Sequence, residues 1–428
     1  MAGSTSIEYR NQLLYSVFVR DYGKNGTFFD VENDLDRIKD LGTDIIWLMP
    51  IHPIGEKGRK GSVGSPYAIK DYRAVNPDFG TLEDFISLTD AIHSKGMKCI
   101  IDVVYNHTSP DSVLANEHPE WFLHNEKGEP IPKVKEWYDI VDLDYSHREL
   151  WDYQIETLKY WARYVDGFRC DVAPLIPLEF WKKAREEVEK VRPHAFWLSE
   201  SVDGGFIRSL RKNGETCLSD SEIYQAFDAA YDYDIYDRLG KYLKGEGALS
   251  DYLRELNRQE EIYPENYIKL HFLENHDRIR AAMMTPDIRL LSHLTAFSFF
   301  EKGLAFLYNG QERCATVHPT LFETDPVDFS GYDLSDVIKR MMKIKRSPIM
   351  AEGEFFSKEI REGIIQASYE MPGEKLFGFF SVGSSPCTVG VSLPEGEYMN
   401  EYSGEKITVY EGTLFIGDDP VIIRVKGA

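Results

Sequence analysis

Short apolar runs alternate with helix-like segments along the first three quarters of the chain. The first unit joins the apolar run LYSVFVR (14–20) to VENDLDRIKDLG (31–42), where apolar residues recur every three or four positions. Alternating strands and helices are typical of an α/β fold with a parallel sheet. Eight such strands favour a closed (β/α)8 TIM barrel over an open sheet. The expected strands lie near residues 14–20, 44–50, 97–107, 166–173, 195–201, 226–234, 267–277 and 303–312, and the one near 226–234 is the weakest.

Two segments interrupt this rhythm. Residues 108–147 are rich in turn formers and carry no pattern of a long helix, which predicts a short loop-rich insert after the third strand. Beyond about residue 350, short apolar runs bounded by glycine and proline predict a β-sandwich. The expected organisation is a barrel over 1–107 and 148–350, an inserted domain over 108–147, and a C-terminal β-sandwich domain over 351–428.

Charge and composition restrict the partners. The formal net charge of −22 would repel nucleic acid and anionic membranes. No apolar run is long enough to span a bilayer, and the N-terminus lacks the pattern of a secretion signal, so we expect a cytoplasmic protein. The oligomeric state stays open. Five scattered cysteines suggest buried thiols rather than a zinc site or disulfides: Cys99, Cys170, Cys217, Cys314 and Cys387.

Charged residues stand where four of the expected strands end. They are Asp102 on the third strand, Arg169 and Asp171 on the fourth, Glu200 on the fifth, and His276 with Asp277 on the seventh. A single acid at a strand end often caps the next helix or pairs with a surface lysine. Four such ends together favour a catalytic site, because barrel enzymes build their sites at the carboxyl ends of the strands.

Two of these carboxyls have different surroundings. Arg169 and Asp171 are two residues apart on one strand and project to the same side, so the guanidinium is expected to lower the pKa of Asp171. Glu200 follows the apolar residues 196–198, which are expected to raise its pKa. An ionised carboxylate that attacks a sugar and a protonated one that releases the leaving group are what glycoside hydrolysis requires.

Six short segments carry a family resemblance. In order, they resemble the signature segments of the α-amylase family of glycoside hydrolases and span essentially the whole barrel. These segments are SPYAIKDYRAVNPDFGT (65–81), DVVYNH (102–107), GFRCDVA (167–173), LSES (198–201), FLENHD (272–277) and YNGQE (308–312).

The resemblance implies roles for particular residues. Asp171 would be the nucleophile, Glu200 the acid/base, and Asp277 the residue that grips sugar hydroxyls and distorts the ring. The implied supporting residues are Tyr67 as a stacking platform, His107, Arg169 and His276 as ligands of the same glucose, and Asp102 as a brace through Arg169. The ordinary alternatives are that Tyr67 is a loop aromatic, that the histidines are hydrogen-bonded loop residues, and that Asp102 is structural.

The implied activity is retaining cleavage of α-glucosidic bonds, mainly α-1,4, in maltodextrins or starch fragments, through a covalent glycosyl-enzyme. Three residues near the nucleophile differ from the family pattern or bear on which bond is cleaved. Pro174 and Leu175 replace the Lys-His pair that many members use on the leaving-group side and to help hold calcium. Val172, after the nucleophile, is more typical of enzymes that cleave α-1,6 bonds.

The remaining expectations concern cofactors and alternative functions. The chemistry needs no cofactor, but structural Ca²⁺ stays open, with Asn106 as one ligand and Asp142 or Asp144 as others. A transglycosylase, an isomerase or an α-1,6-cleaving enzyme could use the same site. A catalytically silent carbohydrate-binding relative and a magnesium-dependent barrel that abstracts protons are the more distant alternatives.

Overall fold

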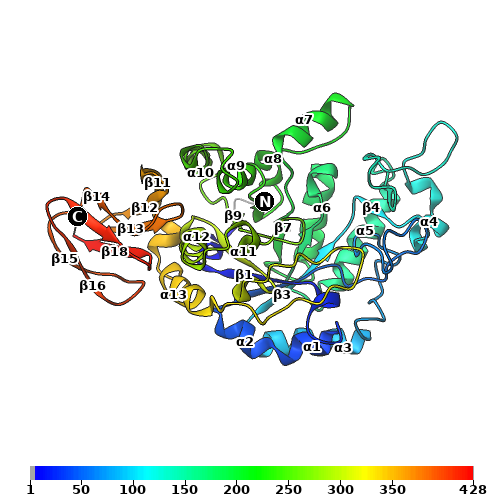
Figure 1. Ribbon diagram of the computed structural model, residues 1–428. Coiled ribbons are helices and arrows are strands. Elements are labelled where there is room, and N and C mark those ends of the chain that lie inside the picture. The colour runs from blue at the N-terminus through cyan, green and yellow to red at the C-terminus, as the bar shows by residue number, and fades with distance from the viewer. Residues whose placement is uncertain (1–4, 428) are drawn as a thin grey trace.

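The computed structural model describes residues 5–427, and at its centre eight parallel strands close into a barrel (Figure 1). Each strand pairs with its neighbours in chain order, and β1 pairs with β10 to close the ring. The predicted (β/α)8 fold is confirmed. The barrel strands are β1 (Leu13–Val17), β2 (Ile45–Leu48), β3 (Lys98–Val103), β6 (Gly167–Cys170), β7 (Phe196–Ser199), β8 (Ala229–Tyr231), β9 (Lys269–His271) and β10 (Leu304–Tyr308).

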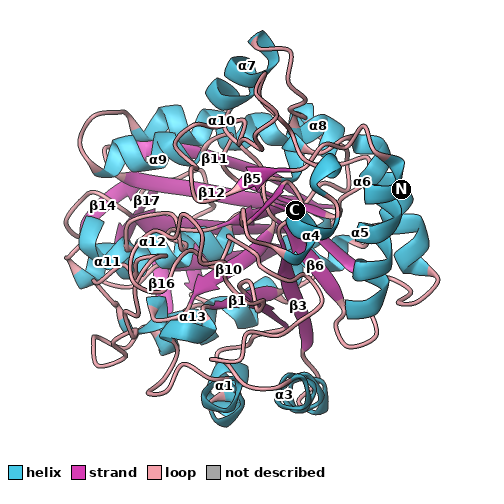
Figure 2. Ribbon diagram, turned by 90° about the vertical axis from the view of Figure 1, so that its right-hand side faces the viewer, coloured by secondary structure: helices cyan, strands magenta, loops and turns pink. Residues whose placement is uncertain are grey.

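Helices surround the barrel (Figure 2). The stretch 31–42, predicted as one helix, is divided between α1 and α2 at Asp34, whose carboxylate pairs with Arg37. The helices are α1 (Phe28–Asn33), α2 (Leu35–Asp40), α3 (Leu82–Ser94), α5 (Arg148–Trp161), α6 (Leu178–Glu189), α7 (Gly204–Lys212), α8 (Asp220–Ile223), α9 (Tyr236–Leu243), α10 (Leu249–Ile262), α11 (Ala281–Met284), α12 (Ile288–Phe300), α13 (Ser335–Lys345) and α14 (Ile349–Glu352).

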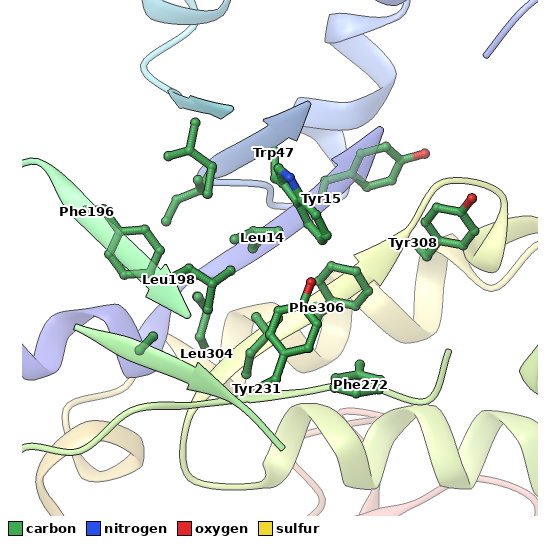
Figure 3. Packing of buried hydrophobic residues seen from close by; sticks show 14 of the residues in the cluster. Leu14, Tyr15, Trp47, Phe196, Leu198, Tyr231, Phe272, Leu304, Phe306 and Tyr308 are labelled. Carbon is green, nitrogen blue, oxygen red and sulfur yellow. The ribbon is translucent and has the colours of Figure 1, made fainter. Parts of the chain in front are cut away.

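Large apolar side chains fill the barrel interior (Figure 3). Trp47 packs against Tyr231 and Phe306 with ring centroids 6.3 and 6.1 Å apart, and Phe272 lies 6.1 Å from Phe306. All four side chains are buried. A barrel packed in this way is solid, so its chemistry must take place at the mouth.

The segment between β3 and α5 has little regular structure. β4 (His107–Thr108) pairs antiparallel with β5 (Val141–Asp142), which places His107 opposite Asp142. The segment also contains α4 (Val113–Glu117) and a 3-10 turn at Pro119–Trp121. These short elements agree with the pattern of residues 108–147, which predicted no long helix.

The C-terminal part is antiparallel and lies at one end of the molecule (Figure 1, orange to red). Its four-stranded sheet has the order β11-β12-β13-β18, and two two-stranded ladders lie beside it. Ile364, Phe379 and Leu414 belong to its own apolar core. Its strands are β11 (Glu354–Arg361), β12 (Ile364–Met371), β13 (Glu374–Ser381), β14 (Cys387–Gly390), β15 (Gly396–Met399), β16 (Lys406–Val409), β17 (Thr413–Ile416) and β18 (Val421–Lys426).

The five cysteines are free thiols, and four of them are buried as expected. Cys387 is an exception because it begins β14, which has only β17 as a partner, and its side chain is half-buried. Within residues 5–427 no helix combines the length and apolar character that crossing a membrane would require.

Candidate active site

The barrel brings the predicted charged residues together at the carboxyl ends of its strands. Asp102 on β3 lies in register with Arg169 on β6, and Asp171 follows β6 directly. Glu200 follows β7, and the loop after β9 carries His276 and Asp277. Neighbouring parallel strands end at one edge, so residues distant in sequence meet there.

Arg169 connects three carboxylates while fully buried. Its Nη1 donates to Asp102 Oδ1 and Asp171 Oδ1, both at 2.9 Å. Its Nη2 lies 2.9 Å from Glu200 Oε2, and its Nε donates to the Tyr231 hydroxyl at 3.2 Å. One guanidinium therefore fixes the relative positions of the carboxylates, and its charge partly offsets theirs.

Asp171 and Glu200 are both buried, and both contact the guanidinium of Arg169. Burial raises the pKa of Glu200 to about 7, although Arg169 lowers it, which confirms the expected direction. Burial also raises the pKa of Asp171, to about 6, although Arg169 acts in the opposite direction. The prediction of a lowered pKa for Asp171 was wrong, because the loss of hydration outweighs the guanidinium. Burial raises the pKa of Glu200 further, so Glu200 is the better placed of the two carboxyls to hold a proton near neutral pH.

The pKa of Asp277 is lowered, whereas those of Asp171 and Glu200 are raised. Burial alone would raise its pKa, but His276, whose Nε2 lies 3.1 Å from Asp277 Oδ2, brings it down to about 2. Asp277 in turn raises the pKa of His276 against the effect of burial. Tyr67 stacks on the His276 ring at 5.5 Å, and its hydroxyl lies 2.8 Å from His276 Nε2 and 3.3 Å from Asp102 Oδ2. Tyr67 is thus part of the site rather than an isolated loop aromatic.

Val172 holds a strained conformation next to Asp171. Its φ of 33° and ψ of 43° lie in the left-handed region, which costs a β-branched residue roughly 1–3 kcal/mol. In this conformation its N–H donates to Glu200 Oε2 at 2.9 Å. The strain therefore positions a donor on the carboxyl with the higher pKa.

His107, which immediately precedes the insert, contributes to the same site. This buried side chain has its Nε2 3.8 Å from Asp171 Oδ2, and burial lowers its pKa. Its Nδ1 contacts Asn106 Nδ2 at 3.2 Å. His107 therefore joins the other predicted residues, and all eight lie in one connected cluster.

The positions that depart from the family pattern lie in an apolar wall next to Glu200. Val172 and Leu175 are buried in one cluster with Leu210 of α7. Half-buried Trp137 from the insert and Phe206 from α7 pack against this cluster, with their ring centroids 6.4 Å apart. Chemically, this side of the site presents aromatic surface rather than charge.

Several of these contacts were not expected from the sequence. Tyr231 supports Arg169 from β8, the strand with the weakest pattern, and Trp47 lies under the guanidinium at 5.1 Å. Trp137 comes from the irregular insert, and Phe206 comes from α7, for which no helix was named from the sequence. Trp47 and Tyr231 lie within the expected strands near 44–50 and 226–234, and this position was the one available signal for them.

Comparison with known families decides the identity of the chain. The model described as "Alpha amylase, catalytic domain" matches residues 12–140 and 116–347, and that described as "Bacterial Alpha amylase C-terminal domain" matches residues 356–423. The chain belongs to the α-amylase family of glycoside hydrolases. The expected resemblance and the expected enzyme class are confirmed.

Solved structures show the same membership. An α-amylase from Lactobacillus plantarum is 46% identical, with a TM-score of 0.96 over 98% of this chain and 100% of that one. The noncanonic maltogenic α-amylase AmyB from Thermotoga neapolitana is 33% identical, with a TM-score of 0.86 over 97% of this chain and 99% of that one. A relative found by sequence is an α-1,4-glucan:maltose-1-phosphate maltosyltransferase of Myxococcus xanthus, which is 32% identical. The matched segment spans 57% of this chain and 38% of that protein.

Proposed function

We propose that this enzyme hydrolyses α-1,4-glucosidic bonds in maltodextrins and starch fragments with retention of configuration. The observation that carries the proposal is that Asp171 and Glu200 are buried on one guanidinium, that of Arg169, with the higher pKa on Glu200. Arg169 holds both carboxyls, with Nη1 2.9 Å from Asp171 Oδ1 and Nη2 2.9 Å from Glu200 Oε2, so the two stand close together. This supports retention, because the carboxyls of an inverting enzyme stand about 6.5–9.5 Å apart to leave room for a water.

The proposed reaction has two steps. In the first, the Asp171 carboxylate attacks the anomeric carbon while Glu200 transfers its proton to the glycosidic oxygen, so that bond breaks and the shortened sugar leaves. In the second, Glu200 takes a proton from water, whose oxygen attacks the same carbon and releases Asp171. Arg169 holds Asp171 in place throughout.

Asp277 is proposed to bind hydroxyls of the reacting glucose. Its pKa of about 2 keeps it charged at any working pH, so it also stabilises the positive charge that develops on the sugar ring. Tyr67 offers the ring a stacking surface, and His107 and His276 offer it hydrogen bonds. Asp102 is proposed to act through Arg169 alone. None of these steps uses a metal or an organic cofactor.

Product analysis tests the proposed bond specificity. Maltoheptaose should yield shorter maltodextrins with one new reducing end for each bond cleaved, and the α-1,6 bonds of pullulan should be left intact. Chromatography of timed digests of maltoheptaose, pullulan and maltose measures both. Cleavage of pullulan at its α-1,6 bonds, with maltoheptaose untouched, would refute the α-1,4 assignment.

The pKa values predict a narrow activity range. As pH falls through about 6, Asp171 gains a proton and can no longer attack. As pH rises through about 7, Glu200 loses the proton that it must donate. kcat/KM should therefore peak between these values and fall on both sides, and the two limbs belong to the coupled pair. A rate that stays flat from pH 5 to 9 would contradict the assigned protonation states.

Transfer to a sugar is the second candidate function, and the apolar wall favours it. Glu200 must lie beside the departing sugar, and Val172, its hydrogen-bond donor, belongs to that wall. Trp137 and Phe206 offer half-exposed rings on which an acceptor sugar can stack, and a bound acceptor competes with water for the glycosyl-enzyme.

Phe206→Ala tests this second candidate. The loss of one stacking ring, worth about 1 kcal/mol, should lower the ratio of transfer to hydrolysis about fivefold when glucose is added as acceptor. Phe356→Ala on β11 provides the control, because Phe356 is 52% exposed and lies in the distant C-terminal sheet (Figure 1). An unchanged ratio in Phe206→Ala would remove the wall from acceptor binding.

Maltooligosaccharides are the only partners proposed. The net charge of −22 opposes binding to nucleic acid or anionic membranes. The five free cysteines support a location in the reducing cytoplasm.

A further inference from the structure

Lys133, a residue of the insert, lies beside Asn106 and Asp142, two of the residues expected as calcium ligands. Lys133 Nζ lies 3.3 Å from Asn106 Oδ1 and 3.9 Å from Asp142 Oδ2. The Lys133 backbone N–H also donates to Asp142 Oδ2, at 3.3 Å. The Lys133 side chain is 10% exposed and that of Asp142 is fully buried, so the ammonium is held inside the protein.

The donor set does not fit calcium. Ca²⁺ binds six to eight oxygens at about 2.3–2.6 Å. Asn106 Oδ1 already accepts from the ammonium, and Asp144, the other candidate, faces His147 at 3.9 Å. Asp142 Oδ1 lacks a hydrogen-bond partner, but a divalent ion there would face the Lys133 ammonium at close range. Across residues 5–427, no three or more His, Cys, Asp or Glu side chains gather as a metal would need.

The local charges balance without a metal. Among residues 5–427, Asp142 is the carboxylate that pairs with Lys133, and a single ammonium neutralises it. Asp139 has a cation of its own, since Lys60 Nζ lies 2.7 Å from it. A divalent ion would leave an excess of positive charge in a buried place.

We propose that the Lys133 ammonium is a built-in substitute for structural calcium. It joins the insert to Asn106 at the end of β3. Asn106 contacts His107, and His107 contacts Asp171, so the ammonium supports the nucleophile's surroundings through two side chains. The inference concerns stability and cation binding, and it holds or fails independently of the proposed reaction.

Thermal unfolding of the full chain with and without calcium tests the proposal. The unfolding midpoint of the wild type should be the same in EDTA and in millimolar CaCl2. In Lys133→Ala, which leaves Asp142 buried and unpaired, the midpoint in EDTA should fall by on the order of 5 °C. CaCl2 should restore at least half of that loss by entering the vacated space, and MgCl2 should not, because Mg²⁺ demands a smaller, near-ideal octahedral site.

Two further variants define the controls. Lys127→Ala makes the same change at an exposed position of the insert and should show neither effect. Lys133→Ala combined with Asp142→Asn should lose the response to calcium. Isothermal titration with CaCl2 gives a second readout, with heat of binding in Lys133→Ala and none in the wild type.

Three results would overturn the inference. The first is that calcium stabilises the wild type or binds to it stoichiometrically. The second is that Lys133→Ala is as stable as Lys127→Ala. The third is that Lys133→Ala is destabilised and calcium does not raise its unfolding midpoint. If Lys133→Ala does not fold, Lys133→Gln is refolded with and without CaCl2. A calcium-dependent yield supports the proposal, and an equal yield overturns it.

Discussion

The Glu200→Gln variant is expected to lose at least about a thousandfold in kcat on maltoheptaose, within the range that acid/base groups contribute. The amide keeps the shape of the side chain and can still accept from Val172 N–H, which contacts Oε2 at 2.9 Å. It has no proton to give to a sugar oxygen. KM should therefore change far less than kcat. Steady-state kinetics on maltoheptaose measure both constants.

A substrate that needs no proton isolates the role of Glu200. An α-maltosyl fluoride has a good leaving group, so Glu200→Gln should cleave its first bond almost as fast as the wild type does. Glu179→Gln, at an exposed position of α6, is the matched control and should leave all rates unchanged. Because Glu200 is also the base of the second step, the comparison uses the burst of fluoride release in the first step. A loss in that burst as large as the loss on maltoheptaose would show that Glu200 does not act as the acid.

Asp171→Asn should be more damaging, with kcat reduced by on the order of 10⁴-fold or more on every substrate, as expected when a nucleophile is removed. The fluoride should not rescue it, because the first step needs the attacking carboxylate whatever the leaving group. Asp102 keeps its pairing with Arg169 at 2.9 Å, so the protein should remain folded. Circular dichroism and the unfolding midpoint check this.

The two variants together separate the roles of the carboxyls. Rescue of Glu200→Gln by the fluoride, without rescue of Asp171→Asn, is the pattern that the proposed mechanism requires. Rescue of Asp171→Asn with no rescue of Glu200→Gln would exchange the two assignments.

Much of the barrel and the site could be predicted because both depend on local patterns. Strand ends such as DVVYNH place Asp102, and closure of the barrel then determines which ends are neighbours. The Arg169–Asp171 contact follows from their spacing on one strand. The contact of Arg169 with Glu200 does not, because it depends on how β6 and β7 are paired.

The failures have physical causes of the same kind. The pKa of Asp171 depends on its burial, which a sequence does not state, so the expected direction was wrong. Lys133 lies in an irregular insert, where no period of apolar residues reveals the path of the chain. No helix was named from the sequence between residues 204 and 262, where α7 and α9 are only nine and eight residues long.

The anomeric form of the first product tests the central claim most directly, because it reports the geometry of the whole site. Attack by Asp171, followed by attack of water on the same face as the departed sugar, gives the α-anomer. Proton NMR of a fresh maltoheptaose digest, recorded before mutarotation, should therefore show the α-anomeric signal rising first. Initial release of the β-anomer would mean direct attack by water and would remove Asp171 as the nucleophile.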